Sequence, residues 1–195
     1  MGIPFAAPPI GKLRFEKPQQ PIPWTKPINA TAYSKGCIPC VKPETKAEQA
    51  LVSEDFLYLN VWSPNLQNFA RRGIVVVTIQ YRLGPFGFLT LNDSSITPNL
   101  GLWDQVSAMQ WIQENIGRFG GNSKQVTIMG ESAGAESGCG PDDLNFLGFA
   151  PIVDGDFLPN QPEVSLKNVP KYPTILGLNQ LKDPLIQANS HTLLA

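Results

Sequence analysis

The chain has 195 residues, 42% of them hydrophobic and 16% charged, so it can bury a core and does not have the composition of a disordered segment. Its 15 basic and 16 acidic residues give a formal net charge of -1, which excludes a general attraction to nucleic acid or anionic lipid. The longest apolar run, over 73–79, has the length of a strand rather than of a membrane-spanning helix.

The first predicted elements follow a proline-rich lead. Residues 1–50 are expected to be extended and broken by turns, because prolines recur throughout them. A strand is predicted over 57–62, where aromatic and β-branched residues end at Ser63-Pro64. The next, over 73–82, is apolar without alternation, which is typical of a strand covered on both faces.

A helix and two more strands are predicted beyond this point. An amphipathic helix is expected from about 103 to 116, closed by Gly117, and strands are expected over 125–129 and 174–178. The helix prediction rests on five apolar side chains at helical spacing: Leu102, Val106, Met109, Ile112 and Ile116. Alternating strands and helices with apolar strands predict an α/β fold with a mostly parallel sheet.

Cysteines and sequons give weaker signals. Cys37 and Cys40 form a C-x-x-C pair, and Cys139 stands alone. A zinc site would need a second pair of ligands, so neither a metal nor a cofactor is predicted, and structural or disulfide use of the pair is favoured. Asn29 and Asn92 begin N-x-[ST] triplets and are candidate glycosylation sites.

One motif carries chemistry. The predicted strand 125–129 runs into Gly130-Glu131-Ser132-Ala133-Gly134, which is the pattern of a sharp turn that exposes a serine at the start of a helix. A breaker cluster over 138–143 leaves little room for that helix. Such a serine acts as a nucleophile only where a base and an oxyanion hole accompany it.

The motif and its neighbours together resemble type-B carboxylesterases, the cholinesterase-like branch of the α/β-hydrolases. The resemblance implies hydrolysis of carboxylic esters through an acyl-enzyme, with a Ser-His-Glu/Asp triad. The segments that carry it lie in the family's order and cover most of the chain to about residue 180: 2–15, 53–64, 75–89, 99–121, 130–134 and 153–159.

The resemblance also assigns roles to individual residues. Ser132 would be the nucleophile, the backbone N–H of Ala133 an oxyanion donor, and Glu131 the acidic neighbour of the nucleophile. Two structural ion pairs are implied as well: Arg14 with Glu54, and Arg82 with Asp104.

The same comparison predicts missing parts. Between the two predicted strands 57–62 and 73–82, relatives carry a further strand and a Gly-rich loop that supplies oxyanion N–H groups; this chain has neither. The expected fold is therefore an incomplete α/β-hydrolase domain over 1–180 whose mostly parallel sheet lacks at least one central strand. Residues 181–195 form an unassigned tail.

The triad partners also lack a match. The chain has one histidine, His191, close to its last residue and in a context unlike that of the family's catalytic histidine. Lys182 stands near the expected place of the triad acid, and Asp183 is displaced by one position. In many relatives the cysteine matching Cys37 bonds to a position that is Phe56 here, which leaves Cys37 either bonded to Cys40 or free.

Three functions remain open on the sequence. The favoured one is a shortened, catalytically impaired carboxylesterase; the others are a non-catalytic binding or adhesion module and an active ester hydrolase. The partner would be a carboxylic ester if the chain is active, and the oligomeric state is left open. Relatives are mostly secreted or retained in the secretory pathway, but residues 1–9 do not form a signal peptide, so localisation is left open too.

Overall fold

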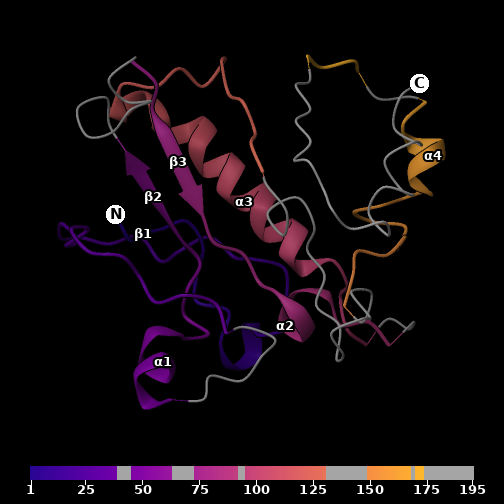
Figure 1. The fold of residues 1–195 in the computed structure, drawn as a ribbon, viewed down its shortest axis with the longest axis horizontal. Helices are drawn as coiled ribbons and strands as arrows, with labels where there is room; N and C mark the ends of the chain where they lie inside the picture. Colours follow the sequence, from indigo (N-terminus) through magenta and orange to yellow (C-terminus); the bar gives the residue numbers. More distant parts are fainter. Residues whose placement is uncertain (39–44, 63–72, 92–94, 131–148, 168–169, 174–195) are drawn as a thin grey trace, which may run out of the picture. The chain divides into compact units, whose positions relative to one another are not determined.

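A computed structural model describes residues 1–38, 45–62, 73–91, 95–130, 149–167 and 170–173 (Figure 1). The chain divides into two compact units, Met1–Gln161 and Pro162–Ala195. In the described part of the second unit there is one short helix, α4 (Pro162–Ser165), which has no buried residue. The proposed tail 181–195 lies outside the described residues.

The first unit contains a three-stranded antiparallel sheet in the order β1-β2-β3. Its strands are β1 (Ile3–Pro4), β2 (Tyr58–Trp62) and β3 (Val76–Ile79). Leu59 of β2 is opposite Ile3 on one side and Ile79 on the other. Both expected strands therefore form, and they pair directly with each other.

Helices and tight turns complete this unit. They are η1 (Gly11–Leu13), α1 (Lys46–Leu51), α2 (Gly84–Phe88), α3 (Leu100–Asn115) and η3 (Ile116–Phe119). The longest helix, α3, begins close to where the sequence predicts, but Gly117 does not end it. The chain continues as a 3-10 turn to Gly120, whose φ of 83° is a conformation that glycine adopts without strain.

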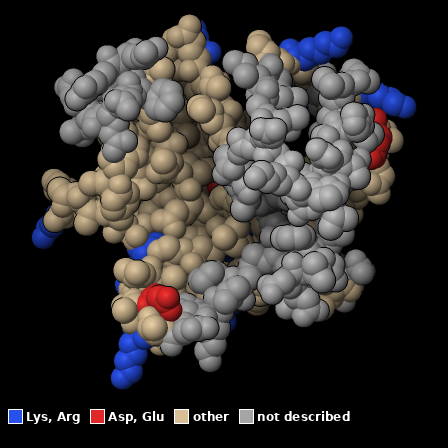
Figure 2. Space-filling model, in the orientation of Figure 1, with Lys and Arg blue, Asp and Glu red and all other residues tan. Residues whose placement is uncertain are grey.

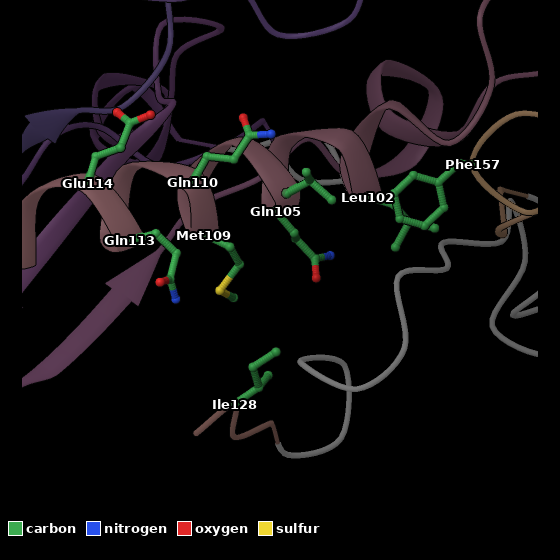
Figure 3. A pocket seen from close by; sticks show the side chains of 9 residues that line it. Leu102, Gln105, Met109, Gln110, Gln113, Glu114, Ile128 and Phe157 are labelled. Carbon is green, nitrogen blue, oxygen red and sulfur yellow. The ribbon is translucent and has the colours of Figure 1, made fainter. Parts of the chain in front are cut away.

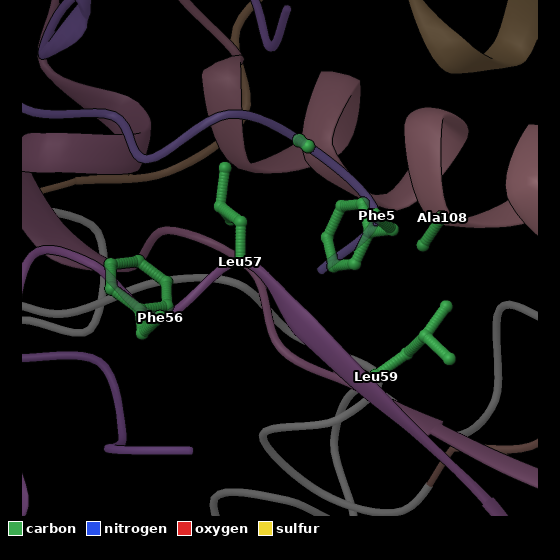
Figure 4. Close-up of a cluster of buried hydrophobic side chains, with 6 residues drawn as sticks. Phe5, Phe56, Leu57, Leu59 and Ala108 are labelled. Carbon is green, nitrogen blue, oxygen red and sulfur yellow. The ribbon is translucent and has the colours of Figure 1, made fainter. Parts of the chain in front are cut away.

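The core lies between β2, the N-terminal segment and α3 (Figure 4). It is built on Phe5, Phe56, Leu57, Leu59 and Ala108, each at most 2% exposed, and Val77, Ile79 and Trp111 pack against it. Gly101 permits close packing at the start of α3, because a Cβ there would lie 2.5 Å from the carbonyl oxygen of Arg82. Among the described residues that Figure 2 colours, the charged side chains are few and lie mostly at the periphery of that view.

Two expectations about the sheet are wrong for the described residues. β3 is not covered on both faces, because Thr78 is exposed and its neighbours are only half-buried. Residues 125–129 are not a strand, and Ile128 and Met129 are 76% and 81% exposed. The three described strands are antiparallel; of the two segments from which parallel pairing is expected, 125–129 forms no strand and 174–178 lies outside the described residues.

Candidate active site

The segment that leads to Ser132, residues 126–130, forms no regular secondary structure and is solvent-exposed. It follows η3 through a turn in which the backbone N–H of Gln125 donates to the carbonyl of Asn122 at 3.0 Å. Val126, Ile128 and Met129 then expose 42%, 76% and 81% of their surface. Glu131, Ser132 and Ala133 themselves lie outside the described residues, as do Asp183 and His191.

Ile128 forms one side of an apolar groove along α3 (Figure 3). The groove has a volume of about 430 Å³. Its apolar lining comes from Leu102, Val106 and Met109 on successive turns of α3 and from Phe157 at one end. Three glutamines and Glu114 of α3 line it as well. Such a lining can hold an apolar group, but the described lining residues offer neither a nucleophile nor an imidazole.

The helical stripe predicted from the sequence is therefore divided between two environments. Ile112 and Ile116 are buried, at 6% and 4% exposure. Leu102, Val106 and Met109 are half-buried and face the groove instead. The buried face of α3 uses Leu100, Asp104 and Ala108, which recur every four residues.

The structure brings together both expected ion pairs. Arg14 holds Glu54 through two hydrogen bonds, from Nε to Oε2 at 2.5 Å and from Nη2 to Oε1 at 3.0 Å, with both side chains partly exposed. Arg82 donates from Nε and Nη2 to the two carboxylate oxygens of Asp104 at 2.8 and 2.7 Å. That second pair is almost completely buried, with side-chain exposures of 1% and 0%.

Arg82 also connects three segments of the chain. Its backbone N–H donates to Asp104 Oδ2 at 3.0 Å, and its Nη1 donates to the carbonyls of Arg14 and Glu16 at 3.1 and 2.9 Å. Burial raises the pKa of the Asp104 carboxyl, while the hydrogen bonds from Arg82 act to lower it. The role of this cluster is to fix the N-terminal segment and the end of β3 to α3.

Asn99 makes a contact that sequence reasoning missed. It has a φ of 57° and is 1% exposed. Its Nδ2 donates to the carbonyl of Ile152 and to Asp154 Oδ2, both at 2.8 Å, and its Oδ1 accepts from the N–H of Ile152 at 3.0 Å. Asn99 directly precedes the observed helix α3, but the helix is predicted only from about residue 103, and the partner of Asn99 lies 53 residues away.

Lys17 and Trp103 form a second unexpected contact. The Lys17 ammonium lies 4.0 Å from the centre of the Trp103 ring and donates to Asp156 at 2.5 Å. Phe157 meets the same indole ring edge-on at 5.1 Å. These contacts hold the 154–158 turn against the first part of α3 and thereby place Phe157 at the end of the groove.

The remaining candidates are a thiol and two asparagines. Cys37 is a free thiol that donates to the carbonyl of Ile38 at 3.4 Å, and burial raises its pKa to about 11. Of the two alternatives that the sequence leaves for Cys37, a bond to Cys40 or a free thiol, the structure has the free thiol; Cys40 itself lies outside the described residues. Asn29 is exposed and its Oδ1 accepts from Thr31 Oγ1 at 2.7 Å, while Asn92 lies outside the described residues.

The described part of the chain holds neither a side-chain cluster suited to a metal ion nor a helix suited to a bilayer. In that part, no three His, Cys, Asp or Glu side chains lie close enough together to bind a metal ion. None of the helices described there has both the length and the apolar character that a bilayer crossing requires.

The sequence profile of the carboxylesterase family matches residues 1–70 and 65–139, which is more than half of the chain. The chain belongs to the carboxylesterase family. The two matches overlap at 65–70, which lies between β2 and β3, where the strand and the Gly-rich loop of relatives are expected to be missing.

Individual relatives agree with this membership. Acetylcholinesterase from Danio rerio is 42% identical over 176 residues, a span that covers 70% of this chain and 28% of that protein. Carboxylesterase 5A from Mus musculus is 40% identical over 174 residues, covering 70% of this chain and 30% of its own length. The chain thus spans less than a third of either carboxylesterase-family relative.

A solved structure shows the fold of this carboxylesterase-family chain. PNB esterase superposes with a TM-score of 0.53 at 36% identity, over 62% of this chain and 31% of the other. The chain therefore has part of an α/β-hydrolase fold. The alignment with the Danio rerio relative runs over 176 residues, but it includes only 70% of the 195 residues of this chain. The relative therefore has residues within the aligned region that have no counterpart in this chain.

Proposed function

We propose that this chain is an internally shortened carboxylesterase-family protein that keeps the nucleophile motif but does not turn over esters. The observation that carries the proposal is the conformation and solvent exposure of residues 126–130, which lead directly to Ser132. They are exposed and form no strand. A nucleophile elbow depends on a strand that holds the serine in a strained turn beside its oxyanion donors.

The composition supports the same proposal. Transfer of the serine proton to an imidazole is what makes the hydroxyl nucleophilic. The chain contains one histidine, His191, and the Gly-rich loop that would supply further oxyanion donors is absent from the sequence between β2 and β3. Loss of one oxyanion donor alone lowers turnover by about 10²–10³.

Covalent labelling of Ser132 tests the proposal. The chain and its Ser132→Ala variant would be treated with a fluorophosphonate probe and weighed by intact-protein mass spectrometry, with a working cholinesterase as positive control. We expect the chain to remain unlabelled, like the alanine variant, while the control is labelled. Stoichiometric labelling that the substitution removes would instead establish an activated serine, and with it an active ester hydrolase.

The groove along α3 favours a second function, which is binding of an apolar ligand without hydrolysis. Its lining by Leu102, Val106, Met109 and Phe157 suits an acyl chain or an aromatic group. Carboxylic esters with an apolar acyl part are the ligand class that family membership suggests. Binding of a non-hydrolysable ester analogue, measured by calorimetry, should be weakened by Val106→Gln and unaffected by Ser132→Ala.

A further inference from the structure

β3 has a neighbour on one side only in the described part of the chain. The backbone N–H of Gln80 donates to the carbonyl of Tyr58 at 3.2 Å. Hydrogen-bonding residues alternate along an antiparallel strand, so Thr78 and Val76 also direct their backbone groups toward β2. Val77 and Ile79 therefore direct their N–H and C=O groups away from β2. No described backbone group pairs with that edge of β3.

This edge lacks the features that normally protect a sheet edge. Residues 73–80 contain no charged side chain and no proline. Most of them are β-branched, and no bulge interrupts the pairing of Val76–Ile79 with β2. Exposed edges in native proteins are commonly blocked by lysine, proline or a bulge, because an unblocked edge binds another strand.

We propose that the free edge of β3 binds the same edge of a second copy of this chain, in antiparallel register about a two-fold axis at Thr78. In this register Val77 is opposite Ile79 of the second copy, and each pair exchanges both backbone hydrogen bonds. Val77 and Ile79 pack against the core of their own copy, so the apolar faces of the two sheets become continuous.

The side chains at the axis are compatible with this pairing. Thr78 is exposed on the opposite face of β3 and would meet Thr78 of the second copy, a cross-strand pair that sheets accept. The nearest following charge, Arg82, is 1% exposed and bound to Asp104, so it does not repel its symmetry mate. A neutral, self-complementary edge therefore selects an identical strand rather than a charged partner.

The solution mass of the whole 195-residue chain tests the proposal. Sedimentation velocity over a hundredfold range of concentration should show a monomer that becomes a dimer as concentration rises. Thr78→Lys and Thr78→Glu each place like charges face to face and should weaken dimer formation by roughly tenfold or more. An equimolar mixture of the two should restore the dimer, because opposite charges then meet. Thr25→Lys, at an exposed threonine outside the sheet, is the matched control.

Hydrogen exchange provides a readout independent of mass. The amides of Val77 and Ile79 should gain protection as concentration rises, whereas those of Val76 and Thr78, which bond to β2, should be protected throughout. A chain that stays monomeric at every concentration overturns the proposal. So does a dimer that Thr78→Lys leaves unchanged, or a failure of the Lys and Glu variants to recover on mixing.

Discussion

Two arginine–carboxylate pairs of the same chemistry occupy opposite environments in this chain. Arg82 and Asp104 are excluded from water, and the guanidinium also binds two backbone carbonyls. Arg14 and Glu54 are partly exposed, with side-chain exposures of 40% and 26%. Removing one partner of a buried pair leaves an uncompensated charge in the core, whereas water replaces the partner of an exposed one.

We therefore expect Asp104→Asn to lower the free energy of unfolding by about 3–5 kcal/mol, because Arg82 stays charged and buried without its counter-ion. Urea denaturation followed by tryptophan fluorescence measures the change. Glu54→Gln is the matched control and should leave the midpoint close to that of the parent chain. Equal losses from both substitutions would show that burial does not separate the two pairs.

The residue scale also shows what a sequence can and cannot predict. The resemblance to the carboxylesterase family implies both ion pairs, and in the structure the two residues of each pair are in contact. Neither the contact of Asn99 with Ile152 nor that of Lys17 with Trp103 was predicted. Both connect residues far apart along the chain, and no local pattern records such a partner.

At the scale of elements, α3 carries apolar side chains on two faces. One face is buried against the core through Leu100, Ala108 and Ile112, and the other lines the groove through Leu102, Val106 and Met109. Helical spacing predicts the existence of the helix but not this division, because which face is covered depends on elements elsewhere. The strand predicted over 125–129 is wrong for a related reason: its composition favours a strand, but a strand needs a neighbour to pair with.

The start of α3 depends on Asn99. We expect Asn99→Ala to lower the free energy of unfolding by about 2–4 kcal/mol, through loss of three hydrogen bonds and the strain of alanine at positive φ. Asn99→Gly removes the strain but not the lost bonds, so it should recover only part of the loss. Urea denaturation measures both, and full recovery in the glycine variant would show that the side-chain bonds contribute nothing.

The pH dependence of stability tests the contact between Asn99 and Asp154 independently. Desolvation acts to raise the pKa of Asp154, but hydrogen bonds from Leu158, Asn99 and Asp156 outweigh it and lower the pKa. Because the pKa of Asp154 is lower in the folded chain than in the unfolded chain, its ionised carboxylate stabilises the fold at pH values above the unfolded-state pKa of about 3.9. This stabilisation is lost as the pH falls through the folded-state pKa. Asp154→Asn should therefore reduce the loss of stability over that acidic range.

At the scale of the whole molecule, family membership was predictable because its motifs occur in order along the chain. The fold was predictable only in outline. The first unit builds its core from the N-terminal segment, β2 and α3, all before residue 120, and its described sheet is antiparallel. The parallel part of the expected sheet depended on a strand that does not form at 125–129 and on one outside the described residues.

The position of the core predicts which part of the chain unfolds as one unit. Phe5, Phe56, Leu57, Leu59 and Ala108 all belong to Met1–Gln161, and α4 in the other unit buries no residue. A chain that ends after Gln161 should therefore keep the thermal midpoint of the 195-residue chain, measured by near-ultraviolet circular dichroism. Leu57→Ala, at 1% exposure, is the comparison and should cost about 2–5 kcal/mol in both lengths of chain. A midpoint that falls on shortening as far as it does in Leu57→Ala would contradict this prediction, because residues 162–195 would then contribute as much stability as a buried core leucine.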